Sequence, residues 1–311
     1  MTNPVGQKTM STSAWALLLL LSFLWGGSFV FAKIAVAEIP PFTLVFLRVA
    51  LAAATLHLVR LALRIRMKWG LRNALNYAVM GLFNNVIAFS LMFTGQTQIS
   101  ASLAAILNAS TPFFTLLVAG LLLADERLSA RRIAGLIVGF AGVIVVIGPR
   151  YLLGMGENLI FELMLIGTAI SYAFAGVWGR RFAGEHPLAT AAGQLTASTI
   201  IMLPIMLIFD DPLALPAPSA TVVASVLALA IVSTGFAYVL FFRILKVAGA
   251  TNVMLVTMLV PVFTGLIAVP LLGESVDALK IAGMFIIAVG MAVLDGRPLA
   301  AARRAFGLAR S

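Results

Sequence analysis

The chain has 311 residues, of which 62% are hydrophobic and only 10% charged, and its mean hydropathy is +1.09. This composition argues against a soluble α/β enzyme, because a soluble domain of this length needs more charged side chains to cover its surface. The formal net charge is +10, but the basic residues stand in short segments between apolar runs, which favours a role in membrane orientation over nucleic-acid binding.

Long apolar runs follow one another along the chain, each close to the roughly 20 residues that a helix needs to cross a bilayer. We expect all of them to be helices, because an open strand in lipid would leave backbone groups unpaired. The first run is too long for the core of a signal peptide, so we expect it to be retained. In chain order, the ten predicted spans are 14–37, 41–63, 73–94, 100–123, 130–148, 159–179, 187–208, 219–243, 251–272 and 278–294.

The basic residues alternate in density between successive loops, and this fixes the predicted orientation. If the N-terminus is cytoplasmic, 17 of the 21 Lys and Arg residues fall in inside segments. The loop from Asp210 to Ser219, which holds three prolines, then lies outside. The sequence therefore predicts a multi-pass protein of a bacterial inner membrane, surrounded by lipid, with both termini cytoplasmic.

An internal repeat relates residues 101–142 to residues 250–290. Pro112 matches Pro261 at an offset of 149, and Glu126 matches Glu274 at an offset of 148. The offset contains five spans, an odd number, so equivalent loops lie on opposite sides of the membrane. The sequence thus predicts one integral membrane domain made of two inverted five-helix repeats, residues 1–150 and 151–311. Inverted repeats provide two exchangeable conformations, one open to each side, which favours a transporter.

Several short motifs, in a fixed order and spacing, resemble those of a known family. They are Leu24-Trp25-Gly26-Gly27-Ser28-Phe29, Phe46-Leu47-Arg48, Ser100-Ala101-Ser102-Leu103-Ala104-Ala105, Glu126-Arg127-Leu128, Phe241-Phe242-Arg243, Gly249-Ala250-Thr251 and Leu272-Gly273-Glu274. Over nearly the whole chain they resemble the drug/metabolite transporter superfamily, EamA-type ten-helix exporters. The resemblance implies export of small metabolites, and the general character is similar to amino-acid exporters of the YddG type. The second repeat lacks the Trp-Gly pair and has Leu195 where Arg48 stands, so any role of those residues is asymmetric.

Polar and aromatic residues in the middle of spans are the candidates for contact with a solute, because polar groups avoid lipid. Asn84 and Asn85 lie in the third span, and Ser233 is equivalent to Asn84 in the eighth. Interhelical hydrogen bonding and core packing are the competing interpretations. The predicted substrate-binding residues are Trp25, Tyr77, Asn84, Asn85, Asn108, Tyr172, Ser233 and Tyr238.

Three further residues stand out within the spans. Pro112 and Pro261 each free a backbone carbonyl one turn earlier, and their symmetric placement favours hinges over fixed kinks. Arg48 is a charge inside the second span that could pair with Glu38, bond to helix ends or attract a carboxylate. We expect its role to be structural.

The sequence offers no group for catalysis or for binding a metal or cofactor. It contains no cysteine, its two histidines are far apart, and no phosphate-binding loop is present. The leading hypothesis is an alternating-access exporter or facilitator of small metabolites, most of all amino acids, that functions as a monomer. The alternatives are proton-driven multidrug efflux, for which a carboxylate deep in a span is missing, and an integral-membrane transferase or receptor.

Overall fold

The computed structural model describes residues 11–68, 70–123, 129–147, 158–248 and 256–295, and every regular element within these ranges is helical. Two apolar stretches, Leu259–Leu272 and Ala278–Val293, are shorter than a full span. Seven stretches are long and apolar enough to cross a membrane: Thr12–Ala35, Pro41–Ala62, Leu71–Gln98, Ala101–Leu122, Leu159–Phe182, Pro187–Phe209 and Ala220–Ile244.

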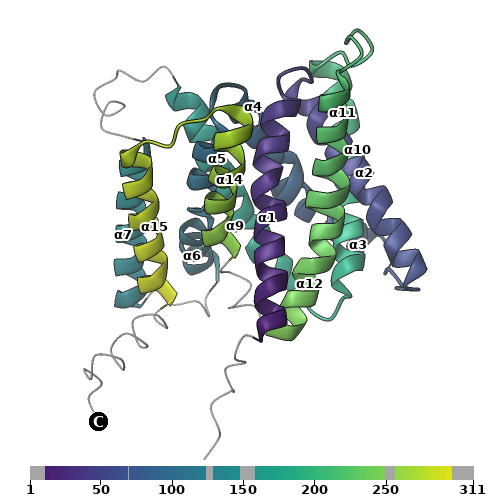
Figure 1. The fold of residues 1–311 in the computed structure, drawn as a ribbon. Helices are drawn as coiled ribbons and strands as arrows, with labels where there is room; N and C mark the ends of the chain where they lie inside the picture. Colours follow the sequence, from purple (N-terminus) through teal and green to yellow (C-terminus); the bar gives the residue numbers. More distant parts are fainter. Residues whose placement is uncertain (1–10, 69, 124–128, 148–157, 249–255, 296–311) are drawn as a thin grey trace, which may run out of the picture.

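The helices stand side by side in one bundle (Figure 1). In the first half they are α1 (Thr12–Ala35), α2 (Pro41–Ala62), α3 (Leu71–Gly81), the π-helix η1 (Leu82–Ile87), α4 (Ala88–Gln98), α5 (Ala101–Asn108), α6 (Thr111–Leu122) and α7 (Ala130–Ile147). In the second half they are α9 (Leu159–Gly179), η2 (Arg180–Phe182), α10 (Pro187–Phe209), α11 (Ala220–Leu227), the π-helix η3 (Ala228–Phe236), α12 (Ala237–Ala248), α14 (Val256–Leu272) and α15 (Ala278–Asp295). A count of ten spans would need α7, α14 and α15 to cross as well, and it stays a prediction.

Capping side chains and prolines set the starts of several helices. The hydroxyls of Ser11, Ser100 and Ser219 accept hydrogen bonds from the first turns of α1, α5 and α11. Pro41 and Pro187 occupy the first turns of α2 and α10, where a missing amide hydrogen costs no helical bond. The starts of these helices therefore follow from local sequence.

Equivalent helices of the two halves pack against each other in opposite directions. At the interface of α7 with α15, a Cβ added at Gly290 would meet Gly139, and one added at Gly142 would meet Gly283 and Ile287. Because residue numbers rise on one helix as they fall on the other, α7 and α15 are antiparallel. The two copies are therefore inverted relative to one another, and the Gly135-x-x-x-Gly139 stripe packs against α15 within the same chain.

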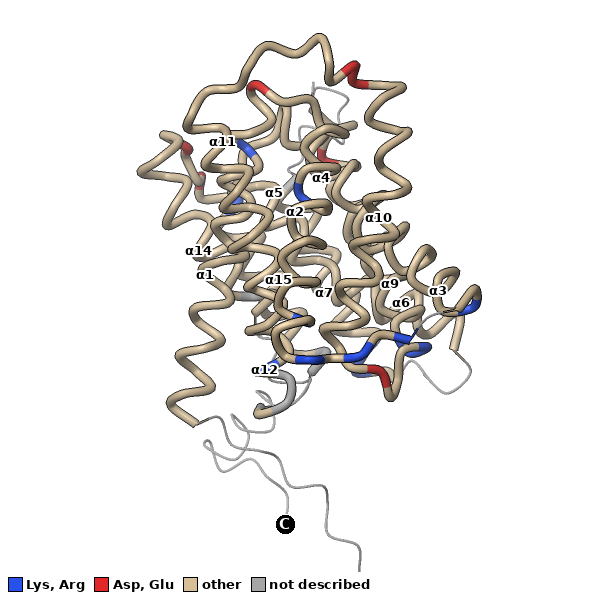
Figure 2. Tube along the Cα trace, turned by 90° about the vertical axis from the view of Figure 1, so that its right-hand side faces the viewer, with Lys and Arg blue, Asp and Glu red and all other residues tan. Residues whose placement is uncertain are grey.

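The charges divide the bundle into a basic end and an acidic end (Figure 2). The basic end holds the last turn of α2 and the loop after it, with Arg60, Arg64, Arg66 and Lys68, and η2 after α9, with Arg180 and Arg181. The acidic end holds the loops after α1, α10 and α14, with Glu38, Asp210, Asp211, Glu274 and Asp277. Several charges used in the orientation argument, among them Lys8, Glu126, Arg127, Arg150 and the basic residues after 295, lie outside the described residues.

Candidate binding cavity

A cavity of about 810 Å³ lies between the two halves of the bundle. Its lining runs from Trp25 and Arg48, in the middle of their helices, to Phe182, Glu185 and Pro187 at the basic end. Residues of both halves contribute to the wall. Of the predicted substrate-binding residues, the cavity brings together Trp25, Asn84, Asn108, Tyr172, Ser233 and Tyr238.

Two π-helices at equivalent positions carry polar residues to this cavity. Residues 82–87 of η1 correspond to residues 231–236, within η3, at the repeat offset of 149. Asn84 comes from η1, and Ser233 and Thr234 come from η3. A π-helix shifts the register of the side chains that follow it and is rare outside functional sites. Its occurrence in both repeats indicates that the polar wall is part of the repeated unit.

The neighbouring amides Asn84 and Asn85 have different surroundings. The side-chain amide of Asn84 donates to the hydroxyl of Tyr238 at 3.2 Å and to Oε1 of Gln194 at 3.3 Å, which links the two halves across the cavity. Asn85 is fully buried, does not line the cavity, and donates to Ser198 Oγ at 2.9 Å. Asn84 therefore faces the space that a solute would occupy, whereas Asn85 joins helices.

Aromatic rings cover much of the remaining wall. Trp25 packs on Phe241 with ring centroids 5.6 Å apart, Phe241 meets Phe242 at 5.2 Å, and Tyr238 stacks on Phe242 at 6.0 Å. Tyr172 lines the cavity as well. The lining is thus mostly apolar with a few polar groups, the usual character of a site for a small organic molecule.

Three buried polar atoms on the lining have no hydrogen-bond partner in the described structure: Asn108 Oδ1, Thr190 Oγ1 and Ser233 Oγ. A buried polar atom left without a partner costs free energy. A solute or water in the cavity would offset this cost, so these atoms mark positions where a polar ligand group can bond.

Tyr77 lies beside the cavity and does not line it. Its ring stacks on Phe182 at 5.4 Å, and its hydroxyl donates to the Glu185 carboxylate at 2.9 Å. Glu185 does line the cavity, and Lys68 Nζ lies 4.0 Å from it. Tyr77 thus positions a charged group near the basic end, and its direct contact with a solute stays a prediction.

Arg48 has different partners from those considered in the sequence. Glu38 does not contact it, and its Nε donates to the Thr234 hydroxyl at 3.1 Å. The guanidinium lies 3.8 Å from the centroid of the Phe89 ring. Arg48 also lines the cavity and is only 6% exposed, and the expectation that its role is structural stays a prediction.

The two predicted hinge prolines differ in their surroundings. Pro112 lines the cavity beside a turn between α5 and α6, and the carbonyl it leaves free, on Asn108, accepts from the Thr111 hydroxyl at 2.6 Å. Pro261 lies inside the continuous helix α14 and is absent from the lining. The symmetry of the sequence is therefore not matched by symmetry of the backbone, and hinge motion stays a prediction.

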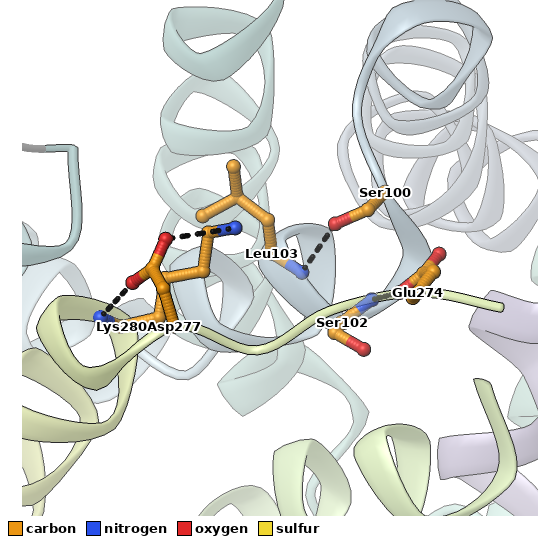
Figure 3. A network of polar contacts seen from close by, with 6 residues as sticks. All are labelled: Ser100, Ser102, Leu103, Glu274, Asp277 and Lys280. Atoms are coloured by element: carbon orange, nitrogen blue, oxygen red, sulfur yellow. Dashed lines mark hydrogen bonds and ion pairs between the residues drawn. The ribbon is translucent and has the colours of Figure 1, made fainter. Parts of the chain in front are cut away.

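Carboxylates hold the acidic end together across the halves. Glu274 accepts hydrogen bonds from two backbone amides at the start of α5, those of Ala101 at 2.6 Å and Ser102 at 2.9 Å. Figure 3 shows the bond from Ser102. Gly273, whose φ of +64° suits glycine, turns the chain after α14 into this contact. A carboxylate at a helix N-terminus satisfies free amides and complements the helix dipole.

Two more carboxylates repeat this arrangement between the halves. Glu38 accepts from the amide and hydroxyl of Ser219, both at 2.7 Å, at the start of α11. These bonds, the amide first, lower the pKa of Glu38 and keep it ionised at neutral pH. Asp210 accepts from the amide of Thr43 at 2.6 Å, at the start of α2. We call Glu38, Asp210 and Glu274 the acidic-end seal.

A second, shallower hollow lies at the acidic end, apart from the large cavity. That hollow has a volume of about 540 Å³, and Glu38 and Glu274 line it. It shares no lining residue with the large cavity. At the basic end, Glu185, the repeat equivalent of Glu38, bonds to Tyr77 and lines the cavity. The structure is therefore closed at the acidic end, and its large cavity extends to the basic end.

Comparisons with known proteins agree with this architecture. A profile of the EamA-like transporter family matches residues 12–148 and again residues 159–294. An uncharacterized transporter of Archaeoglobus fulgidus is 29% identical over 91% of this chain and 97% of its own length. The uncharacterized inner membrane transporter YedA of Escherichia coli K12 is 30% identical over 89% of each chain.

A solved crystal structure shares the fold with a TM-score of 0.64, at 22% identity over 91% of this chain and 98% of the other. The two profile matches cover the two halves that pack as inverted copies, and together they span most of the sequence. The chain is therefore a multi-pass membrane protein that belongs to the EamA-like transporter family.

Proposed function

We propose that this protein is an alternating-access transporter that exports or facilitates the movement of small metabolites, with amino acids as the favoured class. In this proposal ten helices cross a bacterial inner membrane as two repeats, 1–150 and 151–311, and a single chain is the working unit. The basic end and both termini face the cytoplasm.

One observation carries the proposal: a cavity built by both repeats extends to the basic end while the acidic-end seal closes the other. Such a state is what an inward-open transporter requires. Because the repeats are inverted, exchanging the conformations of the two halves would produce a state open at the acidic end. Helices α3 to α6, with α11 to α14, are the elements that would rock, since they supply much of the lining.

The cavity also supports the class of solute. Its volume of about 810 Å³ can hold a small metabolite, and its wall combines aromatic rings with amide and hydroxyl groups. An amino acid has an apolar or aromatic side chain together with a polar backbone end, and both parts find matching surface here.

The test is counterflow in proteoliposomes with a panel of labelled amino acids and other small metabolites. We expect at least one amino acid to exchange, and the exchange to persist when an uncoupler removes the proton gradient. Loss of movement in the presence of uncoupler would favour proton-driven efflux instead. If a folded protein exchanges no amino acid in the panel, the proposed class is wrong.

Asn84 and Asn85 provide a matched pair of variants. We expect Asn84→Ala to weaken the affinity for the transported solute about tenfold, because its amide faces the cavity. Asn85→Ala should instead lower the stability of the protein by about 1–3 kcal/mol, because Asn85 is fully buried against Ser198. Counterflow titration and thermal unfolding distinguish the two effects. Equal affinity in wild type and Asn84→Ala would remove Asn84 from the site.

A further inference from the structure

Arg48 is a positive charge on the wall of an otherwise mostly apolar cavity. It belongs to α2, seven positions after the start of the helix at Pro41. Its side chain is held between the Thr234 hydroxyl, 3.1 Å from Nε, and the face of the Phe89 ring, 3.8 Å from the guanidinium carbon. Both partners also line the cavity. These contacts fix the orientation of the guanidinium, and its terminal nitrogens form no hydrogen bond with the described residues.

No side chain in the described part of the chain neutralises the charge of Arg48. No acidic side chain of the described residues lies within ion-pair distance of it. Among the described residues of the lining, Glu185 is the other charged one, and it lies at the basic end in contact with Tyr77 and Lys68. Burying an unpaired charge costs free energy. The contacts of the guanidinium with Thr234 and Phe89 offset only part of this cost, because each is weaker than an ion pair with a buried carboxylate.

A guanidinium held in this way has the geometry for one ligand group in particular. Its planar donors match a carboxylate, and a charge-assisted bond is strongest where water is excluded. We propose that Arg48 binds the carboxylate of the transported solute, and that the site selects solutes with a single carboxylate. This inference rests on the proposed function, which it deepens by assigning the charged group of the solute to a residue.

The selectivity follows from the charge balance of the cavity. One carboxylate neutralises one guanidinium, whereas a dianion such as a phosphate ester would leave a net negative charge among aromatic rings. An uncharged analogue would leave the guanidinium as unpaired as it is without ligand. The aromatic wall of Trp25, Phe241 and Phe242 can take the apolar part of the same molecule.

The test measures binding to purified protein by thermal stabilisation, which needs no transport. The probes are pairs of an acid and its amide: 3-phenylpropionate with 3-phenylpropionamide, and L-phenylalanine and L-leucine with their amides. For at least one pair, we expect wild type to bind the acid about 10- to 100-fold more tightly than the amide. Arg48→Gln should abolish this preference, while Arg48→Lys should keep part of it.

A control in the same helix is Arg60→Gln, because Arg60 lies near the basic end and is not on the lining. Arg60→Gln makes the same change of charge as Arg48→Gln, but it should keep the preference for the acid over its amide. Arg48→Gln without ligand should unfold at the same temperature as wild type or a higher one, since it removes a buried unpaired charge.

The inference is overturned if wild type prefers no acid in any pair, or if Arg48→Gln keeps the preference. It is also overturned if Arg48→Gln fails to fold, because Arg48 would then be needed for structure. A preference for acids that depends on Arg48, found in a protein that shows no counterflow, would support this binding site and refute the proposed transport.

Discussion

Replacing Glu274 with Ala is expected to raise, about tenfold or more, the rate at which a thiol buried near the acidic end reacts with a labelling reagent. The substitution removes charge-assisted hydrogen bonds from the start of α5. Each bond joins the loop after α14 to the first half of the chain. Without them the conformation closed at the acidic end loses stability relative to the one open there. The population therefore shifts, and the helices themselves stay folded.

The chain contains no cysteine, so a single introduced thiol reports the shift. Ser102 is 2% exposed and does not line the large cavity, so Ser102→Cys should react slowly with a maleimide in the background of the intact seal. The measurement is the labelling rate of Ser102→Cys with and without Glu274→Ala in detergent.

Asp277 supplies the matched control for Glu274. It lies three residues further along the same loop, but its carboxylate accepts from the amide of Lys280, at 2.8 Å, within the start of α15 (Figure 3). Asp277→Ala should leave the labelling rate unchanged, because no bond between the halves is lost. An equal rise in both variants, or no rise with Glu274→Ala, would show that Glu274 does not hold the acidic end closed.

Replacing Gly26 with Ala is expected to destabilise the protein by about 1–3 kcal/mol, and Gly26→Val should prevent folding. A Cβ at position 26 would lie 2.8 Å from Phe263 Cβ and 2.9 Å from the backbone nitrogen of Thr264. The Thr264 hydroxyl also donates to the Gly26 carbonyl at 3.1 Å. The backbones of α1 and α14 are therefore in close contact at Gly26. Backbone atoms cannot move aside as a flexible side chain can.

Substitution of the adjacent glycine, Gly27, with Ala should not destabilise the protein. A Cβ at Gly27 would meet Phe31 and Ile267 side chains at 3.5 Å or more, which is ordinary contact. Gly27→Ala should therefore be neutral or stabilise the helix by up to about 1 kcal/mol, since Ala has the higher helix propensity. Unfolding temperatures and yields of monodisperse protein compare the two variants. Equal stability of both would mean that α1 and α14 can separate without cost.

The disturbance caused by Gly26→Ala should extend to the binding cavity. Trp25 precedes Gly26 and lines the cavity against Phe241. Spreading α1 from α14 would move this ring, so any folded Gly26→Ala protein should also bind its solute more weakly than Gly27→Ala protein does.

The sequence alone determined the class of the protein and the location of the helices. Apolar length and loop charge are local properties, because a helix in lipid must satisfy its own backbone hydrogen bonds. The repeat of Pro112 at Pro261 similarly predicted an inverted pair of halves, since the offset contains an odd number of predicted spans. Both conclusions needed no knowledge of contacts between helices.

Only the tertiary structure decided which polar residues face the cavity. Asn84 and Asn85 are neighbours of the same type, and the register of η1 exposes one to the cavity and buries the other. Arg48 has no nearby acidic residue in sequence that would reveal its environment, and its partners Phe89 and Thr234 lie 41 and 186 positions away. The seal likewise pairs Glu274 with a helix start more than 170 residues earlier. Such contacts depend on how the helices assemble, which no local pattern of residues encodes.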